Sequence, residues 1–311
     1  MFDFIQFFLN SVAPVAFVFF LGYITGKRGS FLNSDASGIF KFIAMISAPA
    51  IIINILITTD ISSLNTNLLT LYVLSELIIY LSAFLFCKIV LKLAYKDALL
   101  CGLAASFGNH VLFVYPVVLF AFPSELITPV KGIITVDIFI FTFTLILLDI
   151  MSRPEIKKTI AALKQIQNPI FMGLIIGLFL RFCLPEEYPI LVRGSEFISY
   201  AAAPCGLFAS GILLSQTPLL GNIKMAAVLT IFKMLLHPFV GFLLIIIIGS
   251  YSFAEAQTTL MVTVAPVGIM AVTFTNRYKI NAEAVAQSVL WSFLISILFI
   301  PILGLLGKEF Q

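Results

Sequence analysis

Apolar runs of about 20 residues, separated by short polar segments, follow one another along the whole chain. This length suits an α-helix that crosses a bilayer, and the two-residue alternation of an outer-membrane β-barrel is absent. We therefore expect an all-α membrane protein with ten transmembrane helices. These helices, numbered here as spans 1 to 10, cover residues 4–25, 34–57, 66–91, 97–122, 128–151, 168–184, 190–215, 222–249, 254–276 and 283–306.

The composition supports the same fold class. Of the 311 residues, 61% are hydrophobic and 11% are charged, whereas about a quarter of the residues of a soluble domain are charged. So few charges cannot cover a soluble surface, and we expect membrane lipid around the protein and no nucleic acid partner. The four cysteines form no CxxC pair, so the sequence predicts neither a metal site nor a disulfide framework. No cofactor is expected either.

The Lys and Arg residues alternate with the spans. Twelve of the 18 lie in or next to the odd-numbered loops between spans, and two lie inside spans. Only four lie in the even-numbered loops or at the termini, namely Lys131, Arg181, Arg193 and Lys308. Because positive residues are retained on the cytoplasmic side of a membrane, the N- and C-termini are both predicted to face outside.

The two halves of the chain resemble each other weakly. The segment ISAPAIIINILI in span 2 is similar to AAAPCGLFASGIL in span 7, and KDALLCGLAASFGNH at span 4 is similar to AEAQTTLMVTVAPVG at span 9. Each half contains five spans, and an odd number inverts the second half relative to the first. The sequence thus predicts two inverted repeats, residues 1–151 and 152–311, an arrangement typical of transporters.

Spans 4 and 9, the fourth of each half, hold helix-breaking residues in the stretches SFGNHVLFVYP and APVGIMA. Broken helices at membrane depth are tolerated only where their backbone faces protein or a water-filled cavity, and two at matching positions indicate a binding site near the midplane. If the breaks cross, free N–H groups and positive helix ends would suit an anion such as a carboxylate. We expect the following residues at this site or at the helix crossing: Ser106, Gly108, Asn109, His110, Pro116, Pro266, Val267 and Gly268.

Two neighbouring polar residues carry the chemistry of span 4. Asn109 can donate and accept hydrogen bonds, so we expect it to contact substrate, the alternative being a bond between helices. His110 titrates near neutral pH and would either carry a proton or hydrogen-bond across the bundle. In span 5, Asp137 is either a proton or cation site or the buried partner of a basic residue.

Glu76 in span 3 and Lys233 in span 8 occupy matching positions of the two halves. We expect that they neutralise each other, or that Lys233 attracts the anion while Glu76 takes a proton. Lys41 in span 2 would either extend to the cytoplasmic interface or support the site. His237 shares a helix face with Lys233 and precedes Pro238, where it would satisfy a freed carbonyl.

Four stretches, in order along the chain, carry a resemblance to a known family. NSDASGIFKFIAMISAPAIIINIL holds an acidic residue, Ser-Gly-Ile, a basic residue and a later proline, and Asn109 precedes Pro116 by seven residues. APVGIMAVTFTNRY holds Pro-x-Gly-Ile before a basic residue and Tyr, and KMLLHP places a proline five residues after Lys233. Together they resemble the auxin efflux carrier family, which includes plant auxin exporters and bacterial carriers of malonate or other organic anions. Two departures, His110 for a small polar residue and Gly108 for a frequent proline, point to a substrate other than auxin.

The resemblance implies a scaffold domain of spans 1, 2, 6 and 7 and a transport domain of spans 3–5 and 8–10, with substrate beside the crossing of spans 4 and 9. It also implies an elevator-like movement of the transport domain and a homodimer formed through the scaffold. The short segment between spans 5 and 6 is similar to that of compact bacterial members, which implies the bacterial inner membrane. The expected protein is a secondary transporter, not an enzyme, that exports a small organic anion.

Sequence motifs bear on the source of energy for transport and on the other classes of protein to which the chain could belong. No phosphate-binding loop GxxxxGK[ST] is present, so we expect a proton or voltage gradient rather than ATP to drive transport. The alternative is a sodium-coupled importer of the related bile-acid symporter type, although the stretch VAPVGIM of span 9 offers few side-chain oxygens to sodium. Motifs of membrane enzymes, such as HExxH or GxSxG, are absent, and no channel filter sequence is visible.

Overall fold

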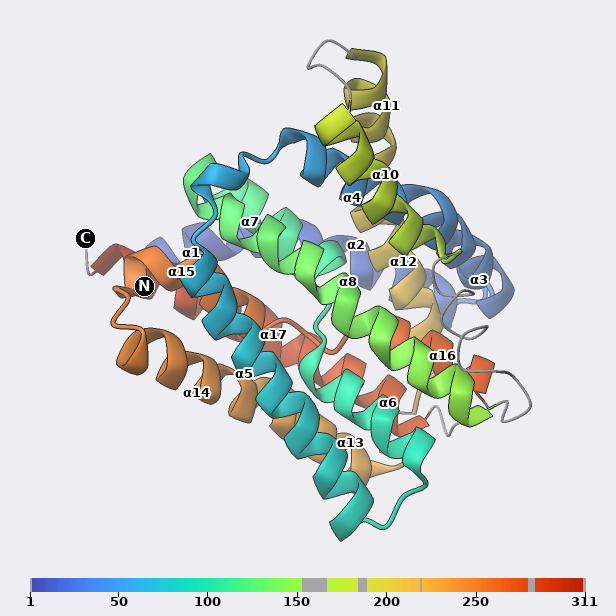
Figure 1. The fold of residues 1–311 in the computed structure, drawn as a ribbon. Coiled ribbons are helices and arrows are strands. Elements are labelled where there is room, and N and C mark those ends of the chain that lie inside the picture. The colour runs from blue at the N-terminus through green and yellow to red at the C-terminus, as the bar shows by residue number, and fades with distance from the viewer. Residues whose placement is uncertain (1, 153–166, 184–188, 219, 279–282, 310–311) are drawn as a thin grey trace. The chain divides into compact units, whose positions relative to one another are not determined.

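The computed structural model describes residues 2–152, 167–183, 189–218, 220–278 and 283–309, and these residues are almost entirely helical (Figure 1). They form two compact units. Unit 1 contains residues 1–17, 64–133 and 216–311, and unit 2 contains residues 18–63 and 134–215. The helices α2 (Ala13–Lys27) and α8 (Ser124–Ser152) each contribute to both units.

Unit 1 is built from helices of three separate parts of the chain. The helix α5 packs along α6, and α17 packs against both α13 and α15. Some helices continue through short π-helical segments, which carry the label η. The elements of unit 1 are α1 (Phe2–Phe7), η1 (Phe8–Val12), α5 (Thr66–Leu85), η4 (Phe86–Val90), α6 (Tyr95–Ser106), η5 (His110–Val114), α7 (Tyr115–Ala121), α13 (Ile223–Ile231), η6 (Phe232–Leu236), α14 (His237–Phe242), η7 (Leu243–Ile248), α15 (Phe253–Thr263), α16 (Met270–Tyr278) and α17 (Glu283–Glu309).

Unit 2 contains α3 (Asn33–Phe42), η2 (Ile43–Ser47), α4 (Ala48–Thr58), the 3₁₀ turn η3 (Ile61–Ser63), α10 (Pro169–Cys183), α11 (Pro189–Ser199) and α12 (Ala202–Ser215). The helix α4 packs against α10 and α11, and α3 packs against α12. A Cβ atom added at Gly173 of α10 would lie 2.8 Å from Pro49 Cα, so a glycine permits this close approach of α4 and α10. Arg181 joins the same two helices, because its Nη1 donates to Leu56 O and Thr59 O, each at 2.7 Å.

Seven helices of the described residues are long and apolar enough to cross a membrane. They correspond to spans 1, 2, 3, 5, 7, 8 and 10, and cover Asp3–Lys27, Asn33–Thr58, Thr66–Val90, Ser124–Ser152, Ile190–Ser215, Ile223–Ile248 and Glu283–Leu306. The chain is therefore a helical membrane protein. Span 6 is a shorter helix, Pro169–Cys183, and spans 4 and 9 are each interrupted, so ten crossings in two repeats remain a prediction.

Four of the π-helical segments, η1, η2, η5 and η6, have a common cause. Each ends two residues before a proline, and the residue before that proline donates its N–H to the carbonyl five residues back. A proline has no N–H and its ring clashes with the carbonyl four residues back, and a wider turn relieves that clash. The prolines are Pro14, Pro49, Pro116 and Pro238. Pro116 thus widens a helix, whereas the interruption of span 4 lies earlier, at residues 107–109.

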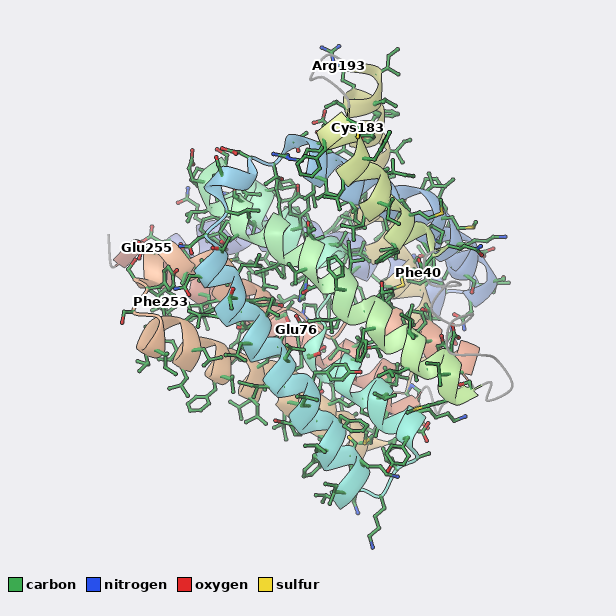
Figure 2. The ribbon with its side chains drawn as sticks, viewed as in Figure 1. Phe40, Glu76, Cys183, Arg193, Phe253 and Glu255 are labelled. Atoms are coloured by element: carbon green, nitrogen blue, oxygen red, sulfur yellow. The ribbon has the colours of Figure 1, made fainter. Side chains whose placement is uncertain are left out.

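Polar caps fix where the helices α15 and α5 begin. Before α15, Ser252 and Glu255 form a capping box, in which Ser252 N donates to Glu255 Oε2 at 2.9 Å and Glu255 N donates to Ser252 Oγ at 3.3 Å. Before α5, Asn65 Oδ1 accepts from Leu68 N at 3.0 Å. Phe253 and Glu255 mark the start of α15 in Figure 2.

Candidate functional site

The interruptions of spans 4 and 9 lie side by side in unit 1. The helix α6 ends at Ser106 and η5 begins at His110, while α15 ends at Thr263 and α16 begins at Met270. We call residues 107–109 the first break and residues 264–269 the second break. The two breaks run antiparallel and form an isolated bridge between Gly108 and Val267.

Two backbone hydrogen bonds flank this bridge. Asn109 N donates to Pro266 O at 2.7 Å, and Gly268 N donates to Phe107 O at 3.1 Å. In an antiparallel pair of this kind, the N–H groups of the two bridged residues point away from each other. Gly108 and Val267 therefore need partners outside the pair.

Side chains supply those outer partners. Gly108 N donates to His110 Nε2 at 3.1 Å, and Val267 N donates to Ser292 Oγ at 2.9 Å. One turn further along α17, Ser296 Oγ donates to Val264 O at 2.7 Å. Each break is thus held by a side chain as well as by the other break.

The N–H groups of the breaks are consequently used inside the protein. Phe107 N donates to Leu103 O at 2.8 Å and Ala265 N to Val262 O at 3.1 Å, while Pro266 has no N–H. With the four bonds above, these account for the N–H groups of residues 107–109 and 265–268. The expectation that the breaks offer free N–H groups to an anion is wrong for these positions, because each of these N–H groups already has an acceptor within the protein.

Asn109 is engaged through its backbone and not through its side chain. It stands at the N-cap of η5, but its side chain makes no capping bond. The residue is 8% exposed, and in the described part of the chain its amide side chain makes no hydrogen bond. The amide therefore keeps its two donors and its acceptor for another molecule.

A buried lysine holds the end of α6. Lys233, in η6, is fully buried, and its Nζ donates to Ser106 O at 2.8 Å. A cation is favourable there, because the last carbonyls of a helix carry partial negative charge. Lys233 Nζ also lies 3.0 Å from His237 Nδ1, so His237 pairs with the lysine and not with a freed carbonyl as the sequence suggested.

The helix α5 brings further polar groups to the same place. Glu76 is fully buried near the middle of α5 (Figure 2), near enough to His110 to interact with it electrostatically. The ring of Tyr72, one turn earlier, lies 6.4 Å from the ring of His110 and 6.0 Å from that of His237. The direct pairing of Glu76 with Lys233 stays a prediction, although α5 and η6 pack together.

The chain that contains these paired breaks and buried ionisable residues matches a known family over most of its length. The model of a family described as "Membrane transport protein" matches residues 7–155 and 153–303. The chain belongs to this family. The match confirms the resemblance to auxin efflux carriers that the four stretches of sequence indicated.

A protein from Rhizobium meliloti (strain 1021) is similar to this chain in sequence. It is named "Putative malonate transporter" and is 24% identical over 297 residues, which cover 92% of this chain and 91% of that protein. Chains of the membrane transport protein family are transporters, and this chain is a membrane transporter of that family.

Two solved structures share the fold. Both are of the sodium proton antiporter MjNhaP1 from Methanocaldococcus jannaschii and are 17% identical to this chain. The first has a TM-score of 0.59 and covers 94% of this chain and 90% of that chain. The second, determined at pH 8, has a TM-score of 0.57 and covers 99% and 97%. This likeness concerns the fold alone.

Two other residues expected at the site of this family member belong to unit 2. Asp137 is buried in α8, and Lys41 is exposed on α3. Their part in the site stays a prediction. Of the remaining expected residues, Pro116 lies in α7, beyond η5, and Ser106 takes part through its backbone carbonyl.

Sequence reasoning missed the serines of α17. Ser288, Ser292 and Ser296 follow one another at four-residue spacing and are fully buried. Such spacing places them on one helix face. A polar stripe on an otherwise apolar span was therefore the signal that a neighbouring backbone needed hydrogen-bond partners.

Proposed function

We propose that the protein is a secondary transporter of a small organic anion, with malonate as the first candidate, and that the anion binds beside the two breaks. The observation that carries this proposal is the paired breaks, which present the uncommitted side-chain amide of Asn109. The name of the Rhizobium relative supports a dicarboxylate as the transported anion.

Two features beside the breaks favour a negative charge. Lys233 places a buried ammonium group on the carbonyl of Ser106, directly before the first break. The starts of η5 and α16 follow the two breaks, and helix starts carry partial positive charge. A carboxylate beside Asn109 would meet the amide donor and these positive groups together.

A voltage gradient can drive such a carrier outward. Moving one elementary charge across 100 mV is worth about 2.3 kcal/mol, and an anion gains this energy when it leaves an inside-negative cell. A dianion gains about twice as much. We therefore propose export, driven by voltage or by a proton gradient, as the resemblance to efflux carriers implies.

The alternating access of the site requires a moving part, and we propose an elevator movement of a transport domain made of spans 3–5 and 8–10 against a scaffold of spans 1, 2, 6 and 7. The similar segments of the two halves support ten spans in two inverted repeats with crossed breaks. The alternation of Lys and Arg supports outward-facing termini in a bacterial inner membrane. A homodimer through the scaffold completes this proposal.

Flux measurements in proteoliposomes test the function. The purified protein is reconstituted, and the uptake of radiolabelled malonate is followed under an imposed voltage, an imposed pH difference or a sodium gradient. We expect accumulation under voltage or a pH difference when choline replaces sodium, and competition by unlabelled small dicarboxylates.

The controls separate transport from leakage. Asn109→Ala should reduce malonate flux at least about tenfold while the protein elutes and unfolds like the wild type, because a lost hydrogen bond to a charged group is worth about 1.5–3 kcal/mol. A strict requirement for sodium would favour the symporter alternative. Unchanged flux in Asn109→Ala would remove this residue from the binding site.

A further inference from the structure

His110 directly follows the first break, and its hydrogen bonding defines a role for it. We propose that His110 is a positioning residue, which holds the first break as a neutral imidazole with its hydrogen on Nδ1. The effect of His110 on transport, through the placement of Asn109, rests on the proposed function. The protonation state and tautomer of His110 do not depend on that function.

The hydrogen bond from the break fixes the chemistry of the ring. Gly108 N can only donate, and it lies 3.1 Å from His110 Nε2. The nitrogen that accepts must carry a lone pair, and a protonated imidazolium has none on either nitrogen. In the neutral ring the hydrogen must then be on Nδ1. A proton carried on Nε2 would break the bond, so His110 cannot hold a transported proton in this conformation.

Packing leaves the ring little freedom. His110 is 2% exposed, and its ring lies 5.6 Å from that of Phe107 and 6.4 Å from that of Tyr72. A Cβ atom added at Gly108 would lie 2.5 Å from His110 Nε2 and 2.7 Å from Ala265 Cβ. Glycine and histidine therefore fit each other at this point, since only a residue without a side chain admits the ring.

Several ionisable groups surround the ring. Lys233 from η6 and Glu76 from α5 lie near enough to interact with it electrostatically, and α14 contributes His237. Tyr72 on α5 is a further ionisable neighbour, since its phenol ring lies beside the ring of His110. The only charged residue of α15, which packs against η5, is Glu255 in its first turn. The hydrogen bond to Gly108, not a net local charge, selects the state of His110.

The function of this bond is to keep an otherwise unpaired N–H out of the membrane interior. Without His110 Nε2, Gly108 N would lie buried without a partner, which is costly where no water is at hand. Asn109 lies between Gly108 and His110, so the bond closes a small ring around the residue that we place against the substrate. The imidazole thereby fixes the direction of the Asn109 side chain.

The state of the ring can be measured directly, because the chain has only two histidines. The full-length protein is labelled with ¹⁵N-histidine and reconstituted in lipid, and ¹⁵N NMR spectra are recorded near pH 7. His237→Gln assigns the signals. We expect one protonated nitrogen, Nδ1, and one unprotonated, hydrogen-bonded Nε2 for His110. A doubly protonated ring, or a hydrogen on Nε2, would overturn the proposal.

A matched pair of variants tests the positioning role. In His110→Gln the side-chain oxygen can reach the place of Nε2, whereas in His110→Asn the amide is one carbon shorter and reaches only the place of Nδ1. We expect His110→Gln to keep malonate flux within about threefold of the wild type and His110→Asn to lose at least about tenfold, as for a buried donor left unsatisfied. Equal flux in the two variants would contradict the positioning role.

Amide hydrogen exchange of residues 107–113 provides a readout without substrate. Protection should be retained in His110→Gln and reduced in His110→Asn, and equal protection in the two would overturn the proposal. If the wild type carries no malonate, the proposed function fails, while the NMR spectra and hydrogen exchange still decide the role of His110.

Discussion

At the residue scale, the environment of Gly108 leads to a clear expectation for Gly108→Ala. The new Cβ would lie 2.5 Å from His110 Nε2 and 2.7 Å from Ala265 Cβ, so the ring or the break must shift. Overpacking of this kind costs about 1–3 kcal/mol, and we expect a lower thermal midpoint in detergent.

Gly38→Ala is the matched control for that change. Gly38 is exposed within α3, and an added Cβ would meet nothing within 4 Å. Alanine in an exposed helix position is favoured over glycine by about 0.5–1 kcal/mol, so Gly38→Ala should raise the midpoint slightly. If both alanine variants shifted the midpoint equally, the crowding at the first break would play no part.

Lys233 gives a second expectation for a single residue. In Lys233→Met the carbonyl of Ser106 and Nδ1 of His237 lose their shared partner. Buried hydrogen bonds to a charged group contribute about 1.5–3 kcal/mol, so flux and thermal stability should both fall. Lys224→Met, an exposed position of α13, should leave both unchanged. A Lys233→Met protein that transports like the wild type would show that the buried ammonium is dispensable.

At the element scale, the buried serines of α17 should stabilise the second break, although the two elements are separate in the sequence. Ser292→Ala leaves Val267 N without its acceptor, which costs about 1–3 kcal/mol for a buried group. Ser288→Ala is the control, because Ser288 Oγ donates to Val285 O of its own helix. Hydrogen exchange at Val267 should accelerate in Ser292→Ala alone, and acceleration in both variants would indicate a general loosening of α17.

Elements were predictable from sequence to different degrees, and the reason is physical. Span lengths follow from apolar runs, so Thr66–Val90 lies within one residue of the expected span 3. The breaks were located from glycine and proline, whereas Pro116 lies beyond the first break, where a π-helical turn absorbs it without ending the helix. The bonds from Lys233 to Ser106 and from Val267 to Ser292 join residues 127 and 25 positions apart, and no local pattern encodes such separations in sequence.

At the scale of the whole molecule, the orientation in the membrane follows from one continuous helix and from the positive residues. Thr66–Val90 is long enough to cross, so the segments before and after it must lie on opposite sides. From the twelve positive residues of the odd-numbered loops we predict that the segment after it, at residues 91–94, lies in the cytoplasm. The segment at residues 59–65 should then face outside.

Single cysteines test this orientation in a background in which the four native cysteines are replaced by alanine. Ser62→Cys and Ala94→Cys both lie at exposed positions, on either side of Thr66–Val90. A membrane-impermeant maleimide should label Ser62→Cys in intact cells, and Ala94→Cys only after the membrane is opened. Labelling in the reverse order would invert the orientation and place both termini inside. Labelling of both from outside would mean that Thr66–Val90 does not cross, because one helix cannot return to the side from which it started.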